Sequence, residues 1–122
     1  VDDVAFLSAL IDTLVAVQGV DPARVFVTGM SNGGMMSHYA ALRLGGKVKA
    51  IAPVVGTLFG DEAAPAAPVR AIIFNGMLDE SVPFGGGPSG GVGRNAWRRD
   101  AAPSLEQGQY WAKANGCGLE PR

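Results

Sequence analysis

The feature that most constrains this chain is a serine between two glycines, with a strand-like run before it and a helix-like run after it. Residues 24–28 are mostly apolar and β-branched, and residues 29–33 read Gly-Met-Ser-Asn-Gly. In this context the chain turns sharply at a strand end, with Ser31 at the apex of the turn. Gly29 and Gly33 remove side chains that would keep strand and helix apart. The pattern predicts a strand, a tight turn and a helix in immediate succession.

This arrangement favours nucleophilic chemistry at Ser31. Its hydroxyl would project at the N-terminus of the new helix, where unpaired backbone N–H groups favour a developing negative charge. The N–H of Asn32 is the expected half of an oxyanion hole. The alternative is that Ser31 only caps the helix. A second match to G-x-S-x-G, at residues 87–91, lacks both flanking elements, so Ser89 is expected in a flexible loop.

Composition limits both the fold and the class of partner. The chain has 122 residues, enough for one small domain, and its hydrophobic fraction of 48% predicts a buried core. A formal net charge of −1, with both signs mixed along the chain, gives no reason to expect a nucleic-acid partner. The apolar runs are too short to span a membrane. One cysteine and one histidine cannot build a Cys/His metal site, and no metal or cofactor is expected.

Hydrophobic spacing predicts alternating helices and strands. Apolar residues recur at helical spacing over residues 3–18, where Asp2 or Asp3 can cap the start and Gly19 can end the helix. Strands are expected at residues 24–28, 47–55 and 69–74, further helices at 32–44 and 104–115, and loops at 56–68 and 84–95. Ser104 to Gln107 fits a capping box for the last helix. This order predicts an α/β fold, with a parallel sheet covered by helices on both faces.

Two candidate residues follow strand ends. Ser31 comes after the first expected strand and Asp79 after the third, and carboxyl ends of parallel strands meet at one edge of a sheet. A serine nucleophile needs a histidine base and an acid that orients it, and hydrolases with this turn carry them in the order serine, acid, histidine. Asp79 is therefore the expected acid, with Glu80 as the second choice. The alternative for Asp79 is a residue that caps its own turn.

A base for this triad is missing from the sequence. The one histidine, His38, lies seven residues after Ser31 in the expected helix. Seven helical residues rise about 10 Å, too far for a hydrogen bond between the two side chains. His38 is therefore expected to be a partly buried helix residue. Asp61 and Glu62, which follow another strand after a longer loop, form a weaker candidate for the acid.

Four segments, in order along the chain, carry a family resemblance: residues 20–27 (VDPARVFV), 29–34 (GMSNGG), 75–84 (NGMLDESVPF) and 110–117 (YWAKANGC). They resemble the polyhydroxybutyrate depolymerase and feruloyl esterase group of α/β-hydrolases. The resemblance implies that Ser31 is the nucleophile and Asp79 the triad acid. It also implies a secreted or periplasmic esterase of small or polymeric esters, with Cys117 bonded to a cysteine beyond Arg122. Members commonly carry His-Gly where this chain has Asn75-Gly76.

The same resemblance predicts a truncated domain. The first strands of the family would precede this sequence and its catalytic histidine would follow it, so residues 1–122 are expected to be an internal fragment that catalyses poorly alone. One alternative is an inactive binding module of the same fold. Another is a nucleotide-binding oxidoreductase, because Thr28-Gly29-x-x-x-Gly33 resembles its fingerprint, although Met35 stands where that pattern wants glycine. A G-x-G-x-x-G match from Gly85 has no strand before it.

Overall fold

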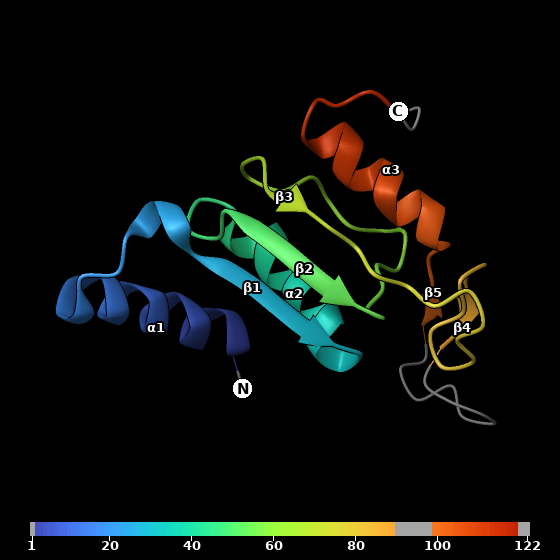
Figure 1. The fold of residues 1–122 in the computed structure, drawn as a ribbon, viewed down its shortest axis with the longest axis horizontal. Helices are drawn as coiled ribbons and strands as arrows, with labels where there is room; N and C mark the ends of the chain where they lie inside the picture. Colours follow the sequence, from blue (N-terminus) through green and yellow to red (C-terminus); the bar gives the residue numbers. More distant parts are fainter. Residues whose placement is uncertain (1, 90–98, 120–122) are drawn as a thin grey trace.

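The computed structural model describes residues 2–89 and 99–119, with one helix before the first strand, one between the first two strands and one after the last strand (Figure 1). The helices are α1 (Asp3–Gln18), α2 (Asn32–Leu44) and α3 (Ser104–Ala114), with a 3-10 turn at Pro22–Arg24. The strands are β1 (Phe26–Met30), β2 (Ala50–Val54), β3 (Arg70–Ala71), β4 (Gly87–Pro88) and β5 (Asp100–Ala101). None of these helices is both long enough and apolar enough to cross a bilayer.

Three parallel strands form the main sheet, in the order β1-β2-β3. Met30 of β1 pairs with Val54 of β2, and an isolated bridge continues this row from Val54 to Phe74. These three residues mark the carboxyl edge of the sheet. Helix α2 connects β1 to β2, because parallel neighbours need a crossover between them. The result is a small parallel sheet with flanking helices, compatible with part of an α/β fold.

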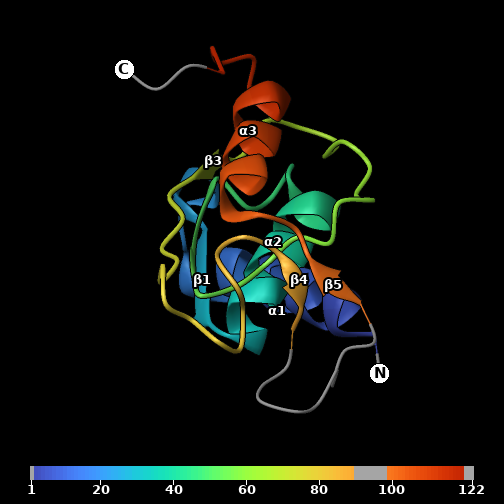
Figure 2. The same cartoon turned by 90° about the vertical axis from the view of Figure 1, so that its right-hand side faces the viewer.

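The core lies between the helices and the inner face of the sheet. Helix α2 packs on β1 and β2, and α1 packs on α2, so that the helices lie on one side of the strands (Figure 2). One buried apolar cluster joins α2, the sheet and α3; its members are Ala41, Val48, Ile51, Leu58, Val69, Ala102 and Trp111. Because the cluster contains residues from distant parts of the chain, apolar contacts hold α3 against α2 and the sheet.

The opposite face of the sheet is uncovered by any helix within residues 2–89 and 99–119. Phe26 and Met30 of β1 are 62% and 71% exposed, and Ile72 and Phe74, which follow β3, are 58% and 50% exposed. Our expectation that helices cover both faces of the sheet is therefore wrong for the described residues. The physical reason is that α1, α2 and α3 all pack on the same side (Figure 2).

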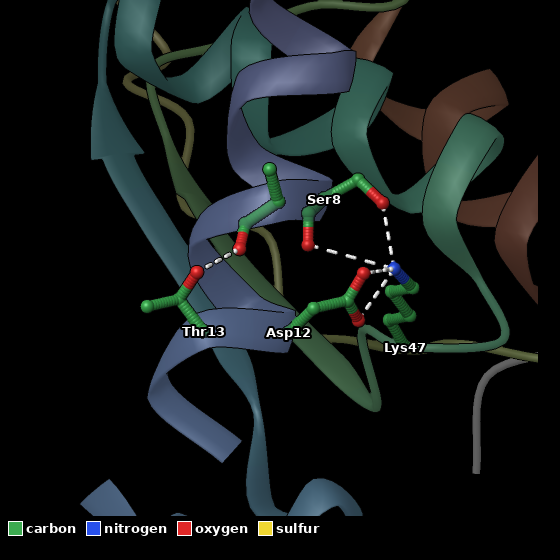
Figure 3. A network of polar contacts seen from close by, with 5 residues as sticks. Ser8, Asp12, Thr13 and Lys47 are labelled. Carbon is green, nitrogen blue, oxygen red and sulfur yellow. Dashed lines mark hydrogen bonds and ion pairs between the residues drawn. The ribbon is translucent and has the colours of Figure 1, made fainter. Parts of the chain in front are cut away.

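Helix α1 has the predicted bounds and the predicted ends. The carboxylate of Asp2 accepts the N–H of Ala5 at 2.9 Å, and Gly19 ends the helix with a φ of 66°. Figure 3 shows how Lys47 holds this helix: its Nζ lies 2.6 Å from Ser8 Oγ and 2.6 and 2.7 Å from the two carboxylate oxygens of Asp12. No residue of α1 is fully buried, so these polar contacts add to the limited apolar packing between α1 and α2.

Helix α2 also has its predicted bounds, whereas β1 and β2 start later than expected. Residues 22–24 form a 3-10 turn because Asp21 caps the N–H of Ala23 at 2.8 Å, and β1 begins only at Phe26. Likewise, Lys47 and Val48 donate their backbone N–H groups to Leu44 O and form a turn directly after α2. Local hydrogen bonds at both places outcompete the sheet ladder.

The predicted capping box of α3 is wrong. Pro103 is the N-cap, and Ser104 is the first helical residue, with no side-chain cap hydrogen bond. The Ser104 hydroxyl instead accepts a hydrogen bond from Asn75 Nδ2 at 3.0 Å, which links α3 to the loop after β3. The helix ends at Ala114, one residue before the expected end.

The glycine-rich segment is less irregular than expected. Strand β4 lies inside it and pairs antiparallel with β5, which comes after it, with Gly87 opposite Ala101 and Pro88 opposite Asp100. Ser89 is 2% exposed and donates its hydroxyl to Arg99 O at 3.3 Å, so the expectation of a flexible position is wrong there. The rest of the second G-x-S-x-G match lies outside the described residues.

Candidate active site

Ser31 stands at the junction between β1 and α2 with an unusual backbone conformation. Its φ is 55° and its ψ is −117°, which a residue with a side chain adopts at a cost of about 1–3 kcal/mol. The backbone is held on both sides: Ser31 N–H donates to Val54 O at 2.9 Å, and Ser31 O accepts from Met35 N at 3.0 Å. The side chain makes no capping hydrogen bond. The alternative role of Ser31 as a helix cap therefore lacks the contact that would define it.

The glycines around Ser31 act unequally. A Cβ on Gly29 would lie 2.5 Å from both the carbonyl carbon and the oxygen of Gly33, so any side chain there would force strand and helix apart. A Cβ on Gly33 would meet nothing within 4 Å. The expectation that Gly33 must also lack a side chain is wrong, because Gly33 contributes its backbone to the contact and its own Cβ direction is open.

Asn32 is the first residue of α2 and is exposed. The N–H groups in the first turn of a helix have no partner within the helix, and the helix dipole places partial positive charge there. The Asn32 N–H therefore lies at the end of α2 that favours an anion, one residue from the Ser31 hydroxyl.

Asp79 lies in the loop that follows the row of Met30, Val54 and Phe74. Its Oδ1 accepts the backbone N–H groups of Ser81 at 2.8 Å and Val82 at 2.9 Å, and its side chain is half-buried. This is the self-capping turn that we considered as the alternative to a triad acid. Among the described residues the other oxygen, Oδ2, has no hydrogen-bond partner. The carboxylate can therefore hold its turn through one oxygen and orient another group through the second.

The segments that lead to Ser31 and Asp79 end at the same edge of the sheet. Ser31 directly follows Met30 at the end of β1, and Asp79 comes five residues after Phe74, which extends the line of β3. Since β2 lies between them, the two strand ends are separated by two strand spacings, about 10 Å.

The weaker acid candidates have structural partners of their own. The carboxylate of Glu62 accepts the N–H groups of Phe59 at 2.6 Å and Gly60 at 2.9 Å, and Asp61 forms an ion pair with Arg99. These residues fold the loop that follows β2. Glu80 is exposed and makes no side-chain hydrogen bond within residues 2–89 and 99–119.

A cleft of about 670 Å³ begins beside the serine turn. It runs along α2 from Asn32 to Arg43 and is closed on the other side by the loop that contains Phe59 and Glu62. The aromatic ring of Phe59 is covered by the Arg99 guanidinium, 4.2 Å from the ring centre. The lining of the cleft thus includes both apolar and charged side chains, and the cleft reaches the N-terminus of α2.

His38 is excluded as the base for Ser31 by its surroundings. It is 1% exposed, and its Nδ1 accepts the indole N–H of Trp111 at 3.0 Å. Burial lowers the pKa of His38 to about 4, so the ring is neutral at pH 7. Because Nδ1 is an acceptor, Nε2 carries the proton and cannot take another from serine. We expected a partly buried helix residue, and the side chain proves to be fully buried.

Stability should fall in acid because of His38. The unfolded chain binds a proton near pH 6.5, whereas the folded chain binds it only near pH 4, where the pKa of His38 lies. The contribution of His38 to the free energy of unfolding should be complete above pH 6.5. This free energy should then decrease by about 3 kcal/mol as the pH falls to 4. Urea unfolding across this range measures it. His38→Gln keeps an acceptor for Trp111 without titrating, so an equal pH dependence in that variant would contradict the assignment.

Two further observations concern Cys117 and metal-binding side chains. Cys117 is exposed and forms no disulfide within the described residues, so its implied bond stays a prediction. In the same part of the chain, no cluster of three or more His, Cys, Asp or Glu side chains could hold a metal ion.

Sequence reasoning missed a contact behind the serine turn. Val55 has a φ of 44°, although it is β-branched, and the next residue, Gly56, touches the backbone of Gly34. The available signals were a glycine directly after the second strand and a doubled glycine in the first turn of α2. A glycine at position 34 or 56 has many possible structural roles when it is considered alone. Only the register of β1 and β2 shows that Gly34 and Gly56 are in contact.

Curated proteins similar to this chain are named as esterases. Feruloyl esterase B of Piromyces equi is 35% identical over 127 residues, covering 99% of this chain and 23% of that protein. A protein of Aspergillus clavatus named "Probable feruloyl esterase C" is 33% identical over 86 residues, covering 70% of this chain and 32% of its own length. The chain thus spans between about a quarter and a third of these relatives. No family model and no solved structure matches it. These similarities support an esterase family for the chain.

Proposed function

We propose that this chain carries the nucleophile and the acid of a serine carboxylic-ester hydrolase with the α/β-hydrolase fold. The observation that carries the proposal is the backbone of Ser31, which is strained, hydrogen-bonded on both sides and free of any side-chain cap. A strained turn that holds a serine hydroxyl free at a helix N-terminus is the arrangement of a nucleophile elbow. The similarity to esterases supports the same chemistry.

In the proposed reaction Ser31 Oγ attacks the ester carbonyl while a histidine takes its proton and passes it to the departing alcohol. Water then gives a proton to the same histidine and attacks the acyl-serine ester, and the histidine returns that proton to Ser31 Oγ as the acid product leaves. The Asn32 N–H stabilises the negative oxygen of each tetrahedral intermediate, and Asp79 orients the histidine through Oδ2. Since His38 is buried and hydrogen-bonded, the histidine of this mechanism is a residue outside residues 1–122.

The substrate class we propose is a feruloyl ester or a hydroxyalkanoate polyester. The relatives' names support the feruloyl ester. The motifs in residues 29–34 and 75–84 resemble those of both feruloyl esterases and polyhydroxybutyrate depolymerases. Initial rates with methyl ferulate and with a 3-hydroxybutyrate oligomer, measured on the protein as its organism makes it, distinguish the two. An extracellular or periplasmic location belongs to the same proposal.

A fluorophosphonate probe tests the nucleophile directly. These probes bond covalently to a serine that a base has activated, so the protein as its organism makes it should gain one probe mass at Ser31. Residues 1–122 alone should stay unlabelled although folded, because their one histidine is buried. Intact mass and peptide mapping give the result, with Ser31→Ala as the control. Labelling that survives in Ser31→Ala would place the nucleophile elsewhere.

A further inference from the structure

The carboxyl end of β2 carries a second strained residue beside the serine turn. Within residues 2–89 and 99–119 two non-glycine residues have a positive φ, Ser31 at 55° and Val55 at 44°. Each stands one position beyond the paired residues Met30 and Val54, on neighbouring parallel strands. A β-branched residue rarely adopts this conformation and keeps it only where its surroundings impose it. The two strained positions therefore belong to one constrained edge.

Hydrogen bonds connect these positions across all three strands. The N–H of Ser31 donates to Val54 O at 2.9 Å, and the N–H of Val55 donates to Phe74 O at 2.7 Å. The ladder thus continues through both strained residues at the point where the strands end. The backbone of Ser31 is tied to the carbonyl directly before Val55, and Val55 is tied in turn to Phe74, which follows β3.

Gly56 fixes the helix side of the same turn. A Cβ on Gly56 would lie 2.4 Å from the carbonyl carbon and 2.7 Å from the Cα of Gly34, and a Cβ on Gly34 would lie 2.9 Å from Gly56 N and Cα. The two backbones are therefore in direct contact, with no room for a methyl group on either. Because Gly34 lies in the first turn of α2, this contact sets the distance between that turn and β2.

We infer that the segment 54–56 positions the nucleophile, an inference that rests on the function proposed for Ser31. Val54 O holds the chain before the serine side chain, and Gly56 holds the helix three residues after it. The positive φ of Val55 turns the backbone from the first contact to the second. Val55 and Gly56 are positioning residues: they act through the direction of Ser31 Oγ and of the Asn32 N–H.

The test is Gly56→Ala in the protein as its organism makes it. The added methyl group must move the first turn of α2 away from β2, and a shift of this size at a reacting group lowers kcat about 100-fold. KM should stay within about twofold, because the substrate contacts are retained. Gly34→Ala should have a smaller effect of the same kind, since its closest contacts are 2.9 Å and not 2.4 Å. Gly46→Ala, at the far end of α2 with nothing within 4 Å of the new Cβ, is the matched control.

A second readout follows the nucleophile itself. The rate of phosphonylation at Ser31 should fall in parallel with kcat in Gly56→Ala. A Gly56→Ala protein with unchanged kcat or with a raised KM alone would overturn the positioning role. If Gly56→Ala loses its circular dichroism, the same two results in Gly34→Ala would overturn it. If Ser31→Ala itself keeps full activity, the proposed function fails, whatever Gly56→Ala does.

Discussion

Ser31→Ala is expected to lower kcat for ester hydrolysis roughly a million-fold in the protein as its organism makes it, leaving only the contribution of the rest of the site. The substitution removes Oγ, the one atom that can form the acyl-enzyme in the proposed mechanism. It should leave the turn intact, because the hydrogen bonds to Val54 and Met35 use the backbone of Ser31 and the side chain caps nothing. Steady-state rates with methyl ferulate and p-nitrophenyl acetate measure the effect, and circular dichroism checks the fold.

Ser89→Ala is the matched control for this experiment. Ser89 sits in the other G-x-S-x-G match, but its hydroxyl is buried and donates to Arg99 O. Its removal should reduce stability slightly and leave kcat unchanged. Activity that survives in Ser31→Ala and disappears in Ser89→Ala would mean that the wrong serine has been assigned.

The parts of the fold that depend on local pattern could be predicted from sequence. Helices α1 and α2 have their predicted bounds because apolar spacing and the residues at their ends agree on where each begins and ends. The parallel sheet followed from the order of helices and strands, and so did the common edge at which the segments before Ser31 and Asp79 end. The information for each helix lay within about fifteen neighbouring residues, and the sheet followed from the order of the elements.

What could not be predicted depends on contacts between distant residues. Ser104 looked like a cap, but its hydroxyl is used by Asn75, which is 29 positions away. Gly34 and Gly56 meet only because β1 and β2 are in register. The pairing of β4 with β5 joins segments that carry no hydrophobic alternation. The same limit applies to the site: a capping aspartate and a triad acid have the same sequence pattern around Asp79, so experiment must separate them.

Asp79→Asn is expected to lower kcat about 10,000-fold while the protein stays folded. Asparagine keeps an oxygen in the place of Oδ1, so the hydrogen bonds from the N–H groups of Ser81 and Val82 can persist. It loses the negative charge and presents an NH2 group where Oδ2 would accept from the histidine, which favours the wrong tautomer of the base. If Asp79 only caps its turn, the Asp79→Asn protein should keep both its stability and its activity. The measurement is kcat across pH together with a thermal unfolding curve.

Asp21→Asn is the matched control, because Asp21 also caps its own turn, at 2.8 Å from the Ala23 N–H, but before β1 at the opposite edge of the sheet. That substitution should leave kcat unchanged. Glu80→Gln tests the second choice for the acid, whose side chain is exposed. If Asp79→Asn keeps full kcat and Glu80→Gln loses it, the acid is Glu80 and Asp79 only shapes the loop. If both keep it, the acid lies elsewhere, and only the serine half of the proposed site survives.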